Sequence, residues 1–429
     1  MLTSFIRWVA IGWMARVAPL CPVTVQLRER ATPRTGVVGG VGTMLGAGVF
    51  VGLAPAAGLA GRWMLVGLAV AALAAVCTGC SFTDLARAYP GIGGGHRYAR
   101  DLLGRWPGRM SGGVGLLGRI AGIAAIAGCF GAYVTPHNSR FGAFAVLVLA
   151  VVVELAAIRL PPALSRALIV VVVIALAVVV VVCFAAPGTP QLGAPGSPGA
   201  DDPAEVLPAA GILFIGFLGG ERGEGRPRPR VKLLLPLLIL AALGTYLAVS
   251  TALLRELGPT RLARSPAPLR DALAAANASV VDPVLTAGVA AATIGVLLAL
   301  VGGTRQMTQA MADAGDLPPI FGSTGTTVAG TLAVGAAGAL AIQLAGPVAA
   351  LELAATCALF AAAFTNAAAR LLERHERAWP ARTACFGLAL SVLLVVAMPP
   401  VALALSVLAM GVGAAIGPLL ALTKRLTTH

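Results

Sequence analysis

The sequence predicts an all-α membrane protein with about 12 transmembrane helices. Hydrophobic residues make up 58% of the 429 residues and charged residues only 11%, whereas soluble domains are roughly 45–50% apolar. Windows of about 20 apolar residues, the length that a helix needs to cross the hydrocarbon layer, recur along the chain. Because the polar stretches between them are short, the function is expected to reside among the helices.

The predicted spans follow one another closely along the chain. They lie near residues 36–60, 63–86, 111–135, 141–160, 164–186, 205–220, 231–254, 283–303, 327–345, 348–369, 383–398 and 400–421. The sixth window is too short to cross a bilayer as one regular helix. An interrupted span is therefore expected at that position.

The basic residues predict the orientation in the membrane. Of the 31 lysines and arginines, 24 fall in segments that a cytoplasmic N-terminus would place inside the cell, and six fall outside. Because positive charge accumulates on the cytoplasmic side, we expect a multi-pass protein of the plasma (inner) membrane with both termini in the cytoplasm. The net charge of +14 does not indicate a nucleic-acid partner, since the basic residues alternate with the spans and form no patch with aromatic residues.

Residues 1–35 leave two interpretations open. They are apolar but are interrupted by Arg7 and Arg16, and they lack the small-residue cleavage site of a signal peptide. The segment is either an amphipathic helix on the inner membrane surface or an over-long start assignment.

Residue patterns typical of enzymes are absent from the sequence. It contains no phosphate-binding loop, no nucleophile beside a base and no zinc-ligand spacing, so we expect neither catalysis nor a cofactor. Cys77 and Cys80 are spaced like a redox pair, but they lie in an apolar span without polar neighbours, and inert packing is expected. The four histidines are far apart in the chain, which argues against a metal site.

Glycines interrupt the first predicted span. The stretch GVGTMLGAGVFVGLAP holds five, and each glycine disfavours a helix by about 1 kcal/mol relative to alanine. A break inside the bilayer is tolerated only where it lines a cavity or is buried in protein. We interpret residues 46–48 as a junction of two half-helices, whose oppositely charged ends suit a ligand with a carboxylate and an ammonium group. The alternative is close helix packing through Gly42-x-x-x-Gly46 and Gly48-x-x-x-Gly52.

The sixth window, GILFIGFLGGERGEG, is again rich in glycine. Paired interrupted spans, each the first of a set of five, are typical of inverted-repeat transporters with a site at the repeat interface. The predicted organisation is a cytoplasmic N-terminal segment (1–35), a first five-helix repeat (36–186), an external loop (187–204), a second five-helix repeat (205–370), two appended helices (371–421) and a cytoplasmic tail (422–429).

Four stretches resemble the amino acid, polyamine and organocation transporter superfamily, in the same order and over roughly residues 36–370. GTMLGAGVFVGLAPAAG is similar to its first span, and SFTDLARAYPGIGGGHRYARDLLG to the end of its second span and the following cytoplasmic helix. GILFIGFLGGER resembles the start of its broken sixth span, and RQMTQAMADAGDLP resembles the inward helix after the eighth.

The resemblance implies a secondary active transporter, or permease, for an amino acid or related amine. It would work by alternating access, with protons as the default coupling ion. The short sixth span leaves an alternative from another class, a non-transporting relative that acts as a ligand sensor or membrane scaffold. Neither the substrate nor the oligomeric state follows from the sequence.

The resemblance also implies which residues hold the substrate. Main-chain groups of the two broken spans would bind it, at Leu45, Gly46, Ala47, Gly48, Val49, Phe214, Ile215, Gly216, Phe217 and Gly219. Phe214 and Phe217 would add an apolar or gating surface, with simple packing as the alternative. The lysine that proton-coupled relatives often carry in the fifth span is replaced by Val172, so coupling through such a lysine is not supported.

Charged residues at membrane depth are candidates for function. Arg119 lies about nine residues into the third span, near mid-membrane at 1.5 Å per residue. It is predicted to replace a bound cation or to hold a carboxylate, and a structural strut bonded to carbonyl groups is the alternative. Glu221 and Glu224 are gate candidates, because about two turns of the sixth span of the family are missing before them. Three acidic residues near span ends are expected to be solvated or paired: Asp84, Glu154 and Glu352.

Overall fold

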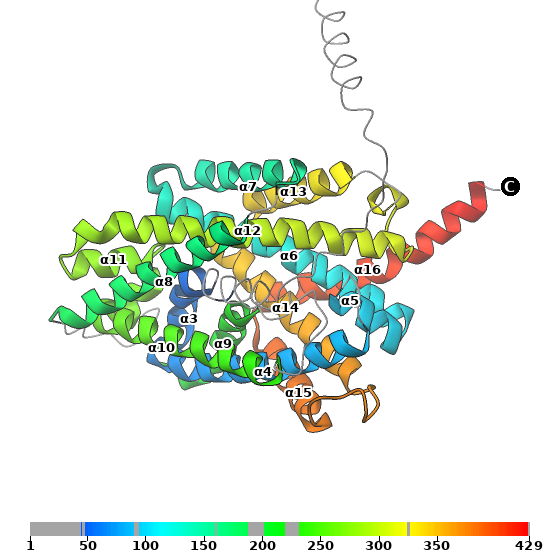
Figure 1. Ribbon diagram of the computed structural model, residues 1–429, viewed down its shortest axis with the longest axis horizontal. Helices are drawn as coiled ribbons and strands as arrows, with labels where there is room; N and C mark the ends of the chain where they lie inside the picture. Colours follow the sequence, from blue (N-terminus) through cyan, green and yellow to red (C-terminus); the bar gives the residue numbers. More distant parts are fainter. Residues whose placement is uncertain are drawn as a thin grey trace, which may run out of the picture. The chain divides into compact units, whose positions relative to one another are not determined.

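A computed structural model describes residues 44, 48–89, 94–158, 161–187, 201–218, 231–323 and 327–427. Every regular element within these residues is a helix (Figure 1), as predicted. The α-helices are α3 (Leu53–Ala60), α4 (Met64–Ala88), α5 (Gly94–Tyr98), α6 (Arg105–Val134), α7 (Ser139–Leu155), α8 (Pro162–Ala185), α9 (Val206–Phe214), α10 (Val231–Arg264), α11 (Pro268–Ala275), α12 (Asp282–Asp313), α13 (Thr327–Leu344), α14 (Pro347–Ala369), α15 (Ala381–Ala397) and α16 (Pro400–Thr427).

All the α-helices except α5 and α11 overlap predicted windows, because hydropathy alone locates segments of this length. Among the described residues, eight helical segments are long and apolar enough to cross a membrane, from Leu53–Ala88 to Pro400–Pro418. Shorter apolar helices cover Pro203–Phe217, Val328–Leu344 and Ala381–Ala397. The chain is thus built as a multi-pass membrane protein, while the count of 12 spans stays a prediction.

Helix α10 extends beyond its predicted window because a second helical stretch follows a kink near its C-terminal end. Gly258 has φ 67° and ψ 167°, a conformation that glycine adopts more readily than residues with a Cβ atom. Pro259 follows, and its missing N–H is tolerated at the start of the next helical turn. The short helix α11, which was not predicted because it is far too short to be a span, follows this turn.

Helix α6 packs against six other α-helices of the described part, α5, α7, α12, α13, α14 and α16. Small residues allow these close approaches. A Cβ atom at Gly113 would lie 2.3 Å from the carbonyl oxygen of Ala409 on α16, and one at Gly118 would lie 2.6 Å from Cβ of Cys357 on α14. The glycines of α6 therefore determine how near its neighbours come.

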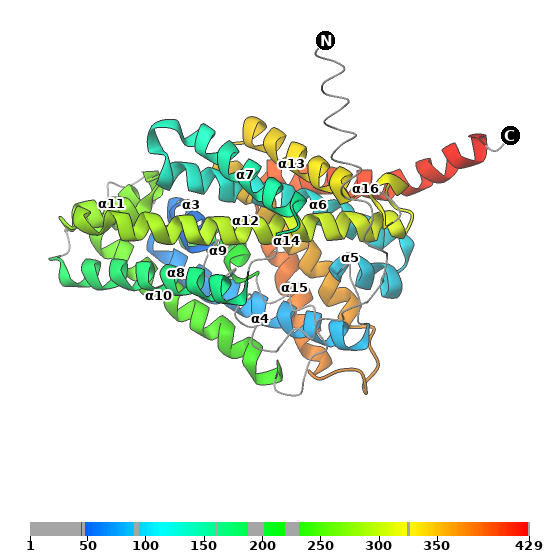
Figure 2. The same cartoon turned by 45° about the horizontal axis from the view of Figure 1, so that its top comes forward.

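The helices of the two predicted repeats contact each other reciprocally. Helices α3, α4, α6 and α7 pack against α9, α10, α12 and α13 respectively, and Figures 1 and 2 show α7 beside α13. The crossed contacts are matched as well, because α3 packs on α10 and α9 on α4, while α6 packs on α14 and α12 on α8. Each of these contacts therefore has a counterpart in which the corresponding helices of the two predicted repeats change places.

The last two helices pack on both predicted repeats. Helix α15 contacts α4, α9 and α14, and α16 contacts α6 and α14. At the turn between α15 and α16, the Sδ atom of Met398 would lie 2.4 Å from a Cβ atom at Gly211 of α9. These helices are thus part of the packed bundle although they follow the second repeat.

Candidate functional site

The first and sixth predicted spans meet through two glycines. Gly48 precedes α3, and Gly216 lies in the 3₁₀ turn Ile215–Phe217 that continues α9. A Cβ atom at Gly48 would lie only 2.3 Å from Cα of Gly216, so the two backbones are in direct contact. Any larger residue at either position would separate the two segments.

The helix of the sixth window is short, as its sequence predicts. The apolar helical segment Pro203–Phe217 is below the about 20 residues of a full span. Helical geometry is lost at Leu218, which has φ −79° and ψ 75°. This end lies beside Gly48, because Gly216 is only two residues before Leu218.

The structure places six of the predicted binding residues at this contact or next to it. Gly48, Val49, Phe214, Gly216 and Phe217 are buried, and Ile215 is half-buried. The remaining candidates lie outside the described residues: Leu45, Gly46, Ala47, Gly219, Glu221 and Glu224. The described part therefore offers mostly backbone and apolar surface.

Tyr246 on α10 is a neighbour of this contact that sequence reasoning missed. Its side chain is fully buried, and its hydroxyl donates to the carbonyl oxygen of Met44 at 3.0 Å. Its ring lies 5.1 Å from the ring of Phe217, centroid to centroid. The available signal was a tyrosine in the middle of a span, because tyrosine usually prefers the membrane interface and needs a polar partner when buried.

Arg119 on α6 faces α12. Its Nη1 atom would lie 2.8 Å from a Cβ atom at Gly303. Also at α12, Nε of Arg305 pairs with Oε1 of Glu154 at 2.8 Å, and Oε2 of Glu154 would lie 3.2 Å from a Cβ atom at Gly302. The prediction that Glu154 is solvated or paired is confirmed, and consecutive glycines of α12 make room for both charged side chains.

Asp84 is also paired, as expected. Its Oδ1 atom accepts from the amide N–H of Ala378 at 2.9 Å, and its Oδ2 atom accepts from that of Trp379 at 3.2 Å. These bonds hold the connection between α14 and α15 against the end of α4. Cys77 and Cys80 are buried thiols in the same helix.

A buried carboxylate, Asp316, joins three basic side chains at the N-terminal end of α6. His96 Nε2 lies 3.3 Å from its Oδ2, Arg109 Nε donates to its Oδ1 at 2.8 Å, and Arg100 Nη1 also bonds Oδ2. Burial alone would raise the pKa of Asp316, but these hydrogen bonds outweigh it and hold the pKa well below its usual range. His96 is buried in the short helix α5.

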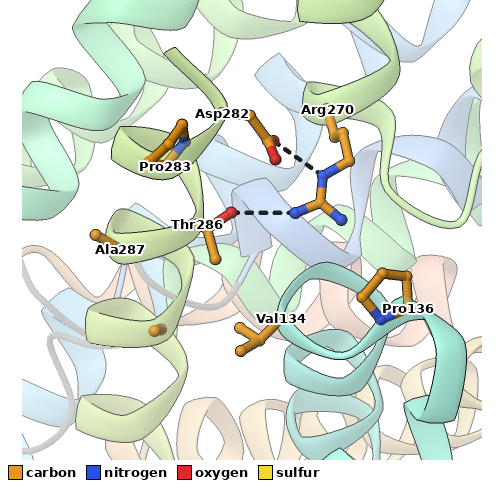
Figure 3. A pocket seen from close by; sticks show the side chains of 8 residues that line it. Val134, Pro136, Arg270, Asp282, Pro283, Thr286 and Ala287 are labelled. Atoms are coloured by element: carbon orange, nitrogen blue, oxygen red, sulfur yellow. Dashed lines mark hydrogen bonds and ion pairs between the residues drawn. The ribbon is translucent and has the colours of Figure 1, made fainter. Parts of the chain in front are cut away.

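A shallow hollow of about 790 Å³ lies at the other end of α6 (Figure 3). It is lined by Val134, Pro136, Arg270, Asp282, Pro283, Thr286, Ala287 and Ala290. Arg270 donates to Asp282 at 2.9 Å and to Thr286 at 3.0 Å, so its charge is already balanced. The predicted binding residues are not among those that line the hollow.

Comparison with known proteins assigns the chain to a family. Residues 36–220 match the family model described as amino acid permease. Uncharacterized transporters of Mycobacterium bovis (strain ATCC BAA-935 / AF2122/97) and Mycobacterium tuberculosis (strains CDC 1551 / Oshkosh and ATCC 25618 / H37Rv) are each 37% identical over 322 residues. The match covers 70% of this chain and 70% of each relative. The chain belongs to the amino acid permease family.

This membership confirms the resemblance that the four sequence stretches indicated. The matched part of the permease, residues 36–220, contains both predicted interrupted spans. The family and the names of the relatives indicate a transporter of a small molecule rather than an enzyme. The contact between Gly48 and Gly216 thus lies in the part of the chain that matches the family model.

Proposed function

We propose that this permease is a secondary transporter that binds an amino acid or related amine where its first and sixth spans meet, and moves it by alternating access. It would act in the plasma membrane with both termini in the cytoplasm. The observation that carries the proposal is the direct backbone contact between Gly48 and Gly216, next to a helix that ends at Phe217.

Main-chain recognition explains why the predicted site is poor in polar side chains. Helix ends inside a membrane leave backbone N–H and C=O groups available, and their partial charges suit an ammonium and a carboxylate group. Val49, Phe214 and Phe217 are buried and apolar. In this proposal they set the shape of the space beside those backbone groups.

Reciprocal packing supports alternating access. In an inverted repeat the two halves can exchange roles, and the site then opens to one side or the other as one bundle rocks against its partner. The matched contacts of α3 with α10 and of α9 with α4 fit that arrangement. Residues 36–186 and 205–370 are accordingly proposed as the two repeats.

Arg119 is proposed as the charge that replaces a bound cation or holds a carboxylate. It lies in the middle of α6 and faces Gly303 of α12, and intramembrane arginines usually point into the protein. Replacing Arg119 by alanine is expected to reduce uptake strongly. Uptake at the parental rate by an equally expressed Arg119→Ala variant would exclude both roles.

Uptake into proteoliposomes tests the proposal. Each of the twenty standard amino acids, radiolabelled, is supplied with and without an inward proton gradient. We expect at least one to accumulate only with the gradient, and a protonophore to abolish the accumulation. If an amino acid enters the proteoliposomes to the same level with and without the gradient, proton coupling is excluded but transport is not. Binding without uptake or exchange of any amino acid would contradict transport and favour the sensor alternative.

A further inference from the structure

The hydroxyl group of Tyr246 lies at the centre of the contact between the two interrupted spans. Its oxygen would lie 2.0 Å from a Cβ atom at Gly48 and 2.2 Å from one at Gly216. Both positions therefore require glycine, because the phenol fills the place of a side chain at each. Tyr246 comes from α10, so three separate helical segments meet at this single oxygen atom.

The hydroxyl uses its single donor at this point. It donates to the carbonyl oxygen of Met44 at 3.0 Å, and a phenol has only one hydrogen to donate. Tyr246 thus bonds the main chain of the first span, although it lies on a different helix.

The ammonium group of an amino acid also donates hydrogen bonds, so it would use a carbonyl such as that of Met44. We propose that the Tyr246 hydroxyl competes with the ammonium group of the substrate for this carbonyl, and that Tyr246 thereby sets the affinity of the permease. This inference rests on the proposed function.

The variant Tyr246→Phe removes the competing hydroxyl and keeps the ring against Phe217. The dissociation constant is measured by isothermal titration of the purified permease with each of the twenty standard amino acids. We expect the amino acids that bind the parent to bind Tyr246→Phe about fivefold more tightly. That factor corresponds to about 1 kcal/mol, the net value of one hydrogen bond.

Tyr133→Phe is the matched control. Tyr133 is also fully buried, but its hydroxyl accepts from the amide N–H of Leu269 at 3.2 Å and does not bond the first span. This variant is expected to bind the same amino acids with the parental dissociation constant. A comparable change in both variants would mean that the effect is a general loss of packing, and it would overturn the inference.

If Tyr246 were only a structural brace, or if it contacted the substrate directly, removal of its hydroxyl would not tighten binding. Unchanged or weaker binding by Tyr246→Phe, together with normal binding by the parent, would overturn this inference and leave the proposed function intact. Binding of no amino acid by the parent or by the variant would contradict the proposed function itself, and this inference with it.

A second measurement covers the case in which Tyr246→Phe does not fold. The chain has four tyrosines, so 3-fluorotyrosine gives four fluorine resonances, and phenylalanine variants at Tyr89, Tyr98 and Tyr133 assign the fourth to Tyr246. We expect that resonance to shift most when an amino acid that binds the parent is added, because the hydroxyl loses its bond to Met44. A Tyr246 resonance that does not shift at saturation would overturn the inference.

Discussion

Asp316 is surrounded by basic side chains that lie more than 200 positions away in the sequence. The carboxylate is inaccessible to solvent, while Arg109 and Arg100 keep 15% and 21% of their side-chain surface. Removing one partner of a buried ion pair leaves the others uncompensated, which is usually strongly destabilising. The partial exposure of the two arginines reduces that penalty.

We expect Asp316→Asn to lower the free energy of unfolding by about 2 kcal/mol, because three basic groups lose their common anion. The measurement is a denaturant titration of the purified permease at pH 7. Asp313→Asn is the control, since Asp313 is exposed and, within the described residues, accepts only from Ser323, and its effect should stay within about 0.5 kcal/mol. Equal effects of the two substitutions would refute the role given to Asp316.

The stability that Asp316 provides should also depend on pH. Its pKa is lower in the folded protein than in the unfolded chain, so its contribution is complete above the usual carboxyl pKa of about 4 and is lost as pH falls below that value. The difference in unfolding free energy between the parent and Asp316→Asn should therefore shrink between pH 5 and pH 3. A constant difference over that range would show that the carboxylate charge is not involved.

Between helices, glycine contacts determine how closely the last helix, α16, packs against α6. A Cβ atom at Gly413 of α16 would lie 2.6 Å from the carbonyl oxygen of Arg109 and 2.9 Å from Cα of Gly113. Both atoms belong to the backbone of α6, so neither can move aside as a side chain would. Gly411 lies in the same helix, and a Cβ atom there would have no neighbour within 4 Å.

We therefore expect Gly413→Ala to destabilise the permease by about 1–3 kcal/mol through overpacking. Gly411→Ala, the matched control, should be neutral or stabilising by up to about 1 kcal/mol, since alanine favours the helix. Thermal unfolding of the two purified variants measures the difference. If both melt at the parental temperature, α16 does not pack on α6 as described.

The sequence could predict where the helices lie, but not which side chains meet between them. Helix positions were predictable because each span is a continuous apolar run, and the interruption near Gly216 was predictable because glycine is a poor helix former. The partners of Tyr246 and Asp316 were not, since contacts between residues 202 and 216 positions apart leave no periodic signal. Arg119 could be singled out by its depth, but its position against Gly303 required the packing of α6 on α12.

For the whole molecule, the distribution of basic residues predicts one orientation in the membrane. Arg140, at the start of α7, should face outward, whereas Arg374, between α14 and α15, should face the cytoplasm. Both are exposed. In a background with the seven cysteines replaced by alanine, a membrane-impermeant maleimide applied to intact cells should label Arg140→Cys at once. It should label Arg374→Cys only after permeabilisation, and the reverse pattern would invert the proposed topology.

In the proposed function, transport depends on the close contact between Gly48 and Gly216. The most direct test compares uptake by Gly48→Ala and Gly58→Ala in proteoliposomes, for an amino acid that the parent accumulates. Alanine at position 48 would collide with Tyr246 and Gly216, whereas at position 58 its nearest neighbour would be Cβ of Ala263 at 3.7 Å. We predict that Gly48→Ala loses uptake and that Gly58→Ala keeps it. Parental uptake by Gly48→Ala would show that transport does not depend on this contact.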